Sequence, residues 1–98
     1  MARFTLQAPT TRYESGKVVM EHLQTLEGHT QNVGALVVGL DGTLFSASDD
    51  RALRVWRVDN GALVLAHTVQ CASAVNALAV GRGGTLYSGD DDGNVIIW

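Results

Sequence analysis

The chain repeats one segment of its own sequence, and this repeat limits the fold more than any other feature. Residues 33–56 align without a gap on residues 75–98, at an offset of 42 positions. Twelve of the 24 aligned positions are identical, far more than two unrelated segments would share. A fixed period of this length is typical of proteins that stack one structural unit. We therefore expect two copies of such a unit.

Each copy has the pattern of three short β-strands. In the first copy, an apolar run at 33–38 ends at a glycine and is followed by a second run at 43–48. A turn with two aspartates then leads to a third run that ends at Trp56. Valine and leucine dominate the apolar positions, and glycines interrupt any helical period. The second copy has equivalent runs at 75–80, at 85–88 and before Trp98.

A further strand is predicted ahead of each triplet. Residues 16–22 and 61–67 share a glycine, an apolar centre and a closing histidine, at an offset of 45. These motifs predict leading strands over 17–26 and 62–69. The expected fold class is all-β, with two units of four antiparallel strands each. The chain is divided into a flexible arm at 1–15, a first unit at 16–56 and a second unit at 57–98.

Composition excludes several classes of function. Ten acidic residues against seven basic ones give a net charge of -3, so no basic surface for nucleic acid or an anionic membrane is expected. The longest apolar run has five residues, far short of the roughly 20 that cross a bilayer. Cys71 is the single cysteine, which excludes an internal disulfide framework. We expect a soluble cytoplasmic protein without cofactor or metal.

Three motifs of the first copy resemble those of the WD-repeat (tryptophan–aspartate repeat) β-propeller family. The family signature is a Gly-His pair, a Ser-x-Ser-x-Asp type turn and a Trp-Asp ending, at a period of about 40–45 residues. Gly28-His29, residues 46–50 and Trp56 match these motifs in turn. The resemblance covers residues 16–98. It departs from the signature at Arg57, which stands where the family has aspartate.

The resemblance implies a hydrogen-bonded set of four side chains in each blade. A buried indole N–H needs an acceptor, a serine hydroxyl provides one, and an imidazole links that hydroxyl to a carboxylate. In the second copy Cys71 takes the place of the histidine, so we expect that blade to be looser. The set comprises His29, Ser46, Asp50 and Trp56 in the first copy, and Ser88, Asp92 and Trp98 in the second.

Three chemical interpretations of the polar residues, as a hydrolase, a calcium loop or a zinc site, are weaker. Histidine, serine and aspartate together suggest a hydrolase, but the sequence has no G-x-S-x-G elbow and the resemblance places Ser46 beneath a tryptophan. Residues 88–93 imitate the opening of a calcium loop, although a plain turn explains them more simply. His22 and His67 lack the spacing of zinc ligands. We expect neither a catalytic nor a metal site.

The resemblance also implies that peptides or proteins bind on the rim of the central channel. The contributing loops precede the first strand and join the second strand to the third. Arg51, Arg54 and Arg57 near one such turn are expected to form a solvated rim, with a patch that contacts a partner as the alternative. The candidate rim residues are Gln31, Asn32, Asp49, Arg51, Ser73, Asp91 and Asn94.

Two blades are too few to close a propeller, which has about four to eight, and each blade relies on its neighbours to cover its faces. We therefore expect the chain to bind itself, with three or four copies giving six or eight blades. The strand at 17–26 would complete the blade that ends at Trp98 in a neighbouring copy. The predicted function is a non-enzymatic interaction or scaffold module that self-assembles into a closed ring. The alternative is a propeller fragment, or an engineered or duplicated two-blade unit, with a structural role and no ligand.

Overall fold

The computed structural model describes residues 12–98. These residues form nine strands and one short 3-10 helix, and no helix among them is long and apolar enough to cross a membrane. The elements are β1 (Arg12–Glu14), β2 (Lys17–Val19), β3 (Val33–Val38), β4 (Leu44–Ser48), β5 (Ala52–Asp59), β6 (Ala62–Gln70), β7 (Val75–Val80), η1 (Arg82–Gly84), β8 (Leu86–Asp90) and β9 (Val95–Ile97).

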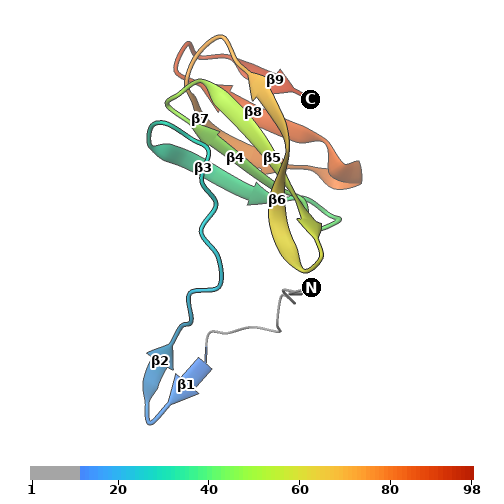
Figure 1. Cartoon of the computed structure of the whole chain (residues 1–98). Helices are drawn as coiled ribbons and strands as arrows, with labels where there is room; N and C mark the ends of the chain where they lie inside the picture. The colour runs from blue at the N-terminus through green and yellow to red at the C-terminus, as the bar shows by residue number, and fades with distance from the viewer. Residues whose placement is uncertain (1–11) are drawn as a thin grey trace.

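The two copies of the repeat fold into two antiparallel sheets that lie against each other (Figure 1). The first sheet has the order β3-β4-β5-β6 and the second the order β7-β8-β9. Strand pairing repeats at the offset of 42, since Leu36 lies opposite Ser46 and Leu78 opposite Ser88. The three strands predicted for each copy are confirmed. The second sheet has three strands in the described part of the chain, however, where four were expected.

The segment ahead of the first sheet differs from the prediction. Arg12–Glu14 was assigned to the arm, but it forms β1 and pairs with β2, whereas residues 1–11 of that arm lie outside the described part. The leading strand expected over 17–26 is regular only at Lys17–Val19. Its remainder forms no ladder with another strand of the described residues, because the β1–β2 hairpin stands away from both sheets (Figure 1). Residues 20–32 lead from this hairpin to β3.

The core lies where the two sheets meet. Successive side chains of a strand point to opposite faces, so each sheet has an inner face toward the other sheet and an outer face. Leu53 on the inner face of the first sheet is 2% exposed, and Val75 at the start of β7 is 1% exposed. A Cβ atom at Gly34 would lie 3.7 Å from the carbonyl oxygen of Val75, an ordinary van der Waals distance, so β3 and β7 are in contact there.

Candidate functional site

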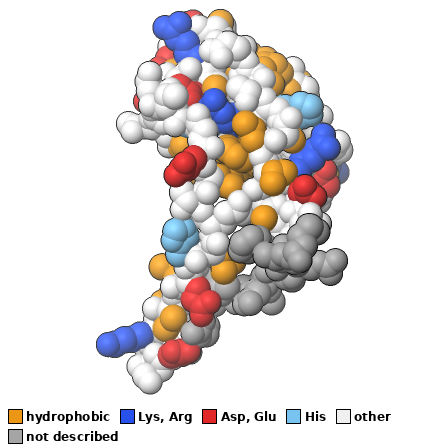
Figure 2. Space-filling model, viewed as in Figure 1, with side chains coloured by type: hydrophobic (Ala, Val, Ile, Leu, Met, Phe, Trp, Pro, Cys, Tyr) orange, Lys and Arg blue, Asp and Glu red, His pale blue; other side chains and the backbone are white. Residues whose placement is uncertain are grey.

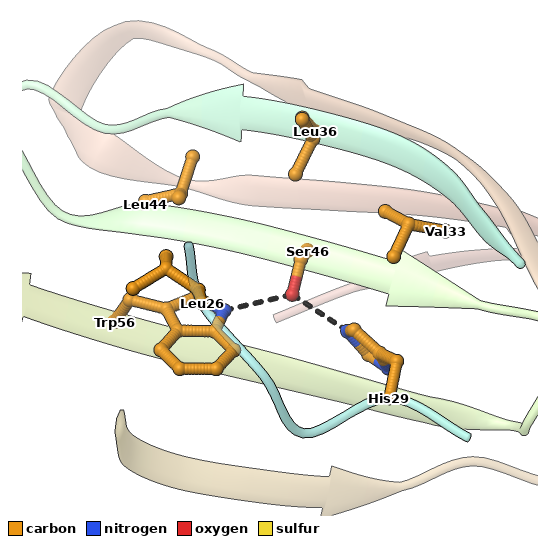
Figure 3. Close-up of a pocket in the computed structure, with 7 residues that line it drawn as sticks. All are labelled: Leu26, His29, Val33, Leu36, Leu44, Ser46 and Trp56. Carbon is orange, nitrogen blue, oxygen red and sulfur yellow. Dashed lines mark hydrogen bonds between the residues drawn. The ribbon is translucent and has the colours of Figure 1, made fainter. Parts of the chain in front are cut away.

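The outer face of the first sheet carries a chain of hydrogen bonds that starts at Trp56 on β5. The indole Nε1–H of Trp56 donates to Ser46 Oγ on β4 at 2.8 Å. Ser46 Oγ lies 2.7 Å from His29 Nε2, and His29 Nδ1 lies 3.0 Å from Asp50 Oδ2. In Figure 3 the indole and the imidazole converge on the serine from opposite sides. The structure thus brings together the four side chains that the resemblance implied for the first copy.

One neutral tautomer of His29 satisfies every group in this chain. The Ser46 hydroxyl accepts from Trp56 and donates to Nε2, while Nδ1–H donates to Asp50. Arg54 Nη1 lies 2.8 Å from the same Nδ1 and 3.2 Å from Asp50 Oδ2. A guanidinium can only donate, so Arg54 binds the carboxylate while Nδ1 keeps its proton. Asp50 therefore anchors the whole arrangement.

Asp50 sits in the turn between β4 and β5 and accepts hydrogen bonds from two segments, the loop before β3 and β5 itself. Oδ2 accepts the backbone N–H of Thr30 at 3.0 Å, and Oδ1 accepts that of Ala52 at 2.9 Å. Burial alone would raise the pKa of Asp50, but these N–H groups and His29 outweigh it and hold the pKa well below its usual range. The carboxylate is therefore charged whenever the protein is folded near neutral pH.

Arg54 is the residue of this site that the sequence interpretation missed. It was assigned to a solvated rim, which is wrong, because its side chain is 15% exposed and pairs with Asp50. The available signal was its position two residues before Trp56, which puts both side chains on one face of β5. Gly28 explains the close fit above them, since a side chain there would lie 3.3 Å from both Arg54 Nε and the Trp56 ring.

The second copy keeps only the first bond of this chain. Trp98 Nε1–H donates to Ser88 Oγ at 2.9 Å, as Trp56 does to Ser46. Asp92, the counterpart of Asp50, is exposed. Two positions earlier, Asp90 Oδ1 accepts the backbone N–H groups of Asp92 and Asn94. The carboxylate of Asp90 therefore stabilises the turn itself, and Asp92 is not brought to Ser88.

Cys71 lies between β6 and β7, at the position of the second copy that corresponds to His29 in the first. Its backbone N–H donates to the carbonyl oxygen of Arg51 at 2.8 Å, and its side chain is half-buried. Burial, together with the charge of Asp90, raises the pKa of the Cys71 thiol. The thiol therefore stays protonated near neutral pH, which lowers its reactivity as a nucleophile.

The candidate rim residues fall into two clusters at one end of the sheets. In the first, the N–H of Asp49 donates to the carbonyl oxygen of Asn32, which ties the loop before β3 to the β4–β5 turn. In the second, the N–H of Asp91 donates to the carbonyl oxygen of Ala74 in the equivalent way. Ser73 differs from the rest, because its hydroxyl oxygen is buried without a hydrogen-bond partner. The exposed members are Gln31, Asn32, Asp49, Arg51, Asp91 and Asn94.

Beside the hydrogen-bonded chain, the outer face of the first sheet is hollowed. The hollow measures about 250 Å³, and its wall is almost entirely apolar. Figure 3 shows Leu26 from the approaching segment on one side and Leu36 from β3 on the other. Within residues 12–98, no group of histidine, cysteine or acidic side chains is arranged to hold a metal ion. The lining residues are Leu26, His29, Val33, Leu36, Leu44, Ser46 and Trp56.

These motifs and strand pairings can be compared with those of known families. The family described as WD domain, G-beta repeat matches the chain at residues 20–57 and again at residues 63–98. The chain belongs to the WD-repeat family. The family and the two repeats predicted from the sequence are confirmed. WD repeats serve as scaffolds for protein–protein interaction.

Proposed function

We propose that the chain is a non-enzymatic protein-interaction module whose two WD repeats self-assemble into a closed ring of three or four copies. The outer faces of its two sheets are the surfaces that would join. A sheet face that exposes many apolar side chains is expected to be covered by a partner, since monomeric proteins rarely expose large apolar patches. Hydrophobic side chains reach the surface over the two-sheet body in Figure 2.

A single observation carries the proposal, namely that equivalent positions of the repeat are buried inside the chain and exposed at its outer faces. Val33 is 50% exposed, but its counterpart Val75 is 1% exposed under the first sheet. Val95 is 74% exposed, but its counterpart Leu53 is 2% exposed under the second sheet. The internal contact between the sheets therefore serves as a template for a contact between copies.

The outer face of the second sheet is complementary to the outer face of the first sheet, as the two inner faces are to each other. The second sheet offers Val95 and Ile97, with Tyr87 beside them. The first sheet offers the apolar hollow around Leu36. A contact of one face with the other is head-to-tail, and such contacts give a ring when the rotation between copies closes. Two repeats per chain restrict a closed ring to even numbers of blades.

Within such a ring, the two rim clusters would recur around one end of the channel. Their exposed carboxylates, amides and Arg51 offer hydrogen bonds and charge to a peptide or protein ligand. A catalytic role for Ser46 is disfavoured, because the residue is 3% exposed and its oxygen is bonded to Trp56. A nucleophile needs an accessible oxygen beside its base.

A matched pair of leucine variants tests the assembly. Leu36 lies on the outer face of the first sheet and is 63% exposed, while Leu40 lies in the β3–β4 turn and is 76% exposed. Leu36→Glu places a charge in the proposed contact, whereas Leu40→Glu places the same charge outside it. We expect the mass by light scattering to fall to that of one chain for Leu36→Glu and to stay unchanged for Leu40→Glu. Equal masses for the two variants would contradict the proposed contact.

A further inference from the structure

The β1–β2 hairpin has the same strand pairing as the tip of the β5–β6 hairpin, at an offset of 45 residues. Their turns agree as well, since Ser15 and Gly16 have φ values of 50° and 77°, and Asn60 and Gly61 have φ values of 51° and 78°. The pairs and their counterparts are Arg12–Val19 and Arg57–Val64, Tyr13–Val18 and Val58–Leu63, and Glu14–Lys17 and Asp59–Ala62. The hairpin ahead of the first sheet therefore has the conformation of a blade edge.

The β5–β6 hairpin shows which part of a blade this is. The pairing of β5 with β4 ends at Trp56, and residues 57–59 pair with β6 alone. These residues are the tail of a third strand, and β6 is the fourth strand that follows the turn. By the same register, β1 is the tail of a third strand and β2 begins a fourth. The second sheet has neither part among the described residues.

We infer that the segment from Arg12 to Thr25 completes the second sheet of another copy of this chain, pairing along β9 in the register that β6 has along β5. The inference rests on the proposed self-assembly and on the joining strand expected from the sequence, and it deepens them by adding the β1–β2 hairpin and by giving the register. In the first sheet Leu53 lies opposite Val69 and Trp56 opposite Leu65. The corresponding pairs between copies are Val95 with Gln24, and Trp98 with Met20.

The side chain of Gln24 already points in the direction that this pairing requires, toward the next sheet. Its counterpart Val69 is opposite Leu53 and so belongs to the inner face, toward the next sheet. Gln24 likewise reaches the next sheet, because Nε2 donates to the carbonyl oxygen of Leu63 at 2.7 Å and Oε1 accepts its N–H at 3.0 Å. The segment is thus attached to the first sheet through a side chain, as the fourth strand of a preceding blade would be.

The partner sheet has to belong to a different copy. Leu26 lines the hollow on the outer face of the first sheet, and the second sheet packs on the inner face. The first sheet therefore stands between residues 20–25 and the β9 edge of the same chain. Met20 and Leu23 in this segment are 75% and 50% exposed, which leaves apolar side chains available for such a contact.

Mixed disulfides between single-cysteine variants test the register. Each variant carries Cys71→Ser, so the introduced thiol is the only one in the chain. Gln24→Cys is unfolded and refolded together with Val95→Cys, or with Ile96→Cys as the control, and then oxidised mildly. Val95 is the inferred partner of Gln24, while Ile96 is one residue out of register and points to the opposite face. We expect about tenfold more mixed disulfide with Val95→Cys, because disulfides need close, correctly directed Cβ atoms.

Each outcome bears on a definite claim. Equal yields with Val95→Cys and Ile96→Cys, or no mixed disulfide with Val95→Cys while light scattering shows an assembly, would overturn the register but leave the self-assembly. A single-chain mass for the unmodified protein would overturn both. Leu23→Cys with Ile96→Cys repeats the test at the next pair, with Leu23→Cys and Val95→Cys as its control. This second set decides the matter if Gln24→Cys fails to assemble.

Discussion

Trp56 and Trp98 occupy the same position of the repeat and donate the same hydrogen bond to a serine, yet Trp56 is 4% exposed and Trp98 is 47% exposed. Trp56 lies between β4 and β6 and beneath Gly28, and its serine continues to His29 and Asp50. Trp98 is next to β8 alone within the described residues. A conserved hydrogen bond is therefore not what buries the tryptophan. The fourth strand and the histidine loop do so, and both come from outside the triplet.

Truncating the two tryptophans is expected to give the largest difference between the copies. Trp56→Ala removes a fully packed ring and should lower the free energy of unfolding by about 3–5 kcal/mol. Trp98→Ala removes a ring that no histidine loop of the described residues covers, even where a neighbouring copy supplies the fourth strand, and should cost about 1–2 kcal/mol less. Urea denaturation at one fixed chain concentration measures both, since the stability of an assembly depends on concentration. Equal losses would mean that Trp98 is as well covered in solution as Trp56.

Removing the serine hydroxyl sharpens the comparison at the hydrogen bonds alone. Ser46→Ala leaves both the buried indole N–H and His29 Nε2 without a partner, which should cost about 2–3 kcal/mol. Ser88→Ala leaves only the indole N–H of Trp98 without its partner, since no histidine among residues 12–98 is bonded to this serine, and should cost about 1 kcal/mol. Thermal unfolding followed by circular dichroism, with unchanged spectra at low temperature as the control, compares the two variants. A larger loss for Ser88→Ala would break the account.

The aspartates should differ in their response to pH. The lowered pKa of Asp50 in the folded state means that its charge contributes stability above pH ~4, where the unfolded chain ionises, and that this contribution disappears as the pH falls toward the folded pKa. Asp50→Asn should therefore cost about 1–2 kcal/mol at pH 7. That cost should shrink as the pH is lowered from 4 to 2. Asp92→Asn, at an exposed position, is the control and should change little at either pH. A cost for Asp50→Asn that does not depend on pH would contradict this.

The turns should give the smallest effect. Arg51 has a φ of 66°, and its counterpart Gly93 has a φ of 84°. A residue with a side chain is strained in this left-handed region, whereas glycine is not. Arg51→Gly should therefore raise the free energy of unfolding by about 0.5 kcal/mol, since relief of strain exceeds the entropy that glycine costs. Gly93→Ala should have the opposite sign. A destabilised Arg51→Gly would show that the Arg51 side chain makes a contact worth more than its strain.

The sequence predicted the elements that the repeat itself contains, because two copies of one pattern reinforce each other. The repeat was enough to predict the strands around Ser46 and Ser88 and to indicate the family. The aspartate of the second turn could not, because Asp90 and Asp92 are both acidic and only the backbone geometry decides which one accepts the turn N–H groups. Arg54 was missed because its charge suggested solvent, although Asp50 compensates that charge beneath Gly28.

The β1 strand was missed for a different reason. The match between residues 16–22 and 61–67 was found, but the segments before them share little beyond Arg12 and Arg57. The common feature is conformational, a left-handed pair at Ser15-Gly16 and Asn60-Gly61 that reverses the chain. Residues 20–25 could not be predicted as irregular either, since their strand pattern is satisfied only when a sheet edge lies beside them.

The mass of the unmodified chain in solution tests the central claim most directly. Light scattering at several concentrations, coupled to gel filtration, measures it without a label or a variant. The account predicts three or four times the 10.4 kDa of one chain, with little change on dilution, because a closed ring has no free outer face left to exchange. A well-folded species near 10.4 kDa at all concentrations would contradict the account.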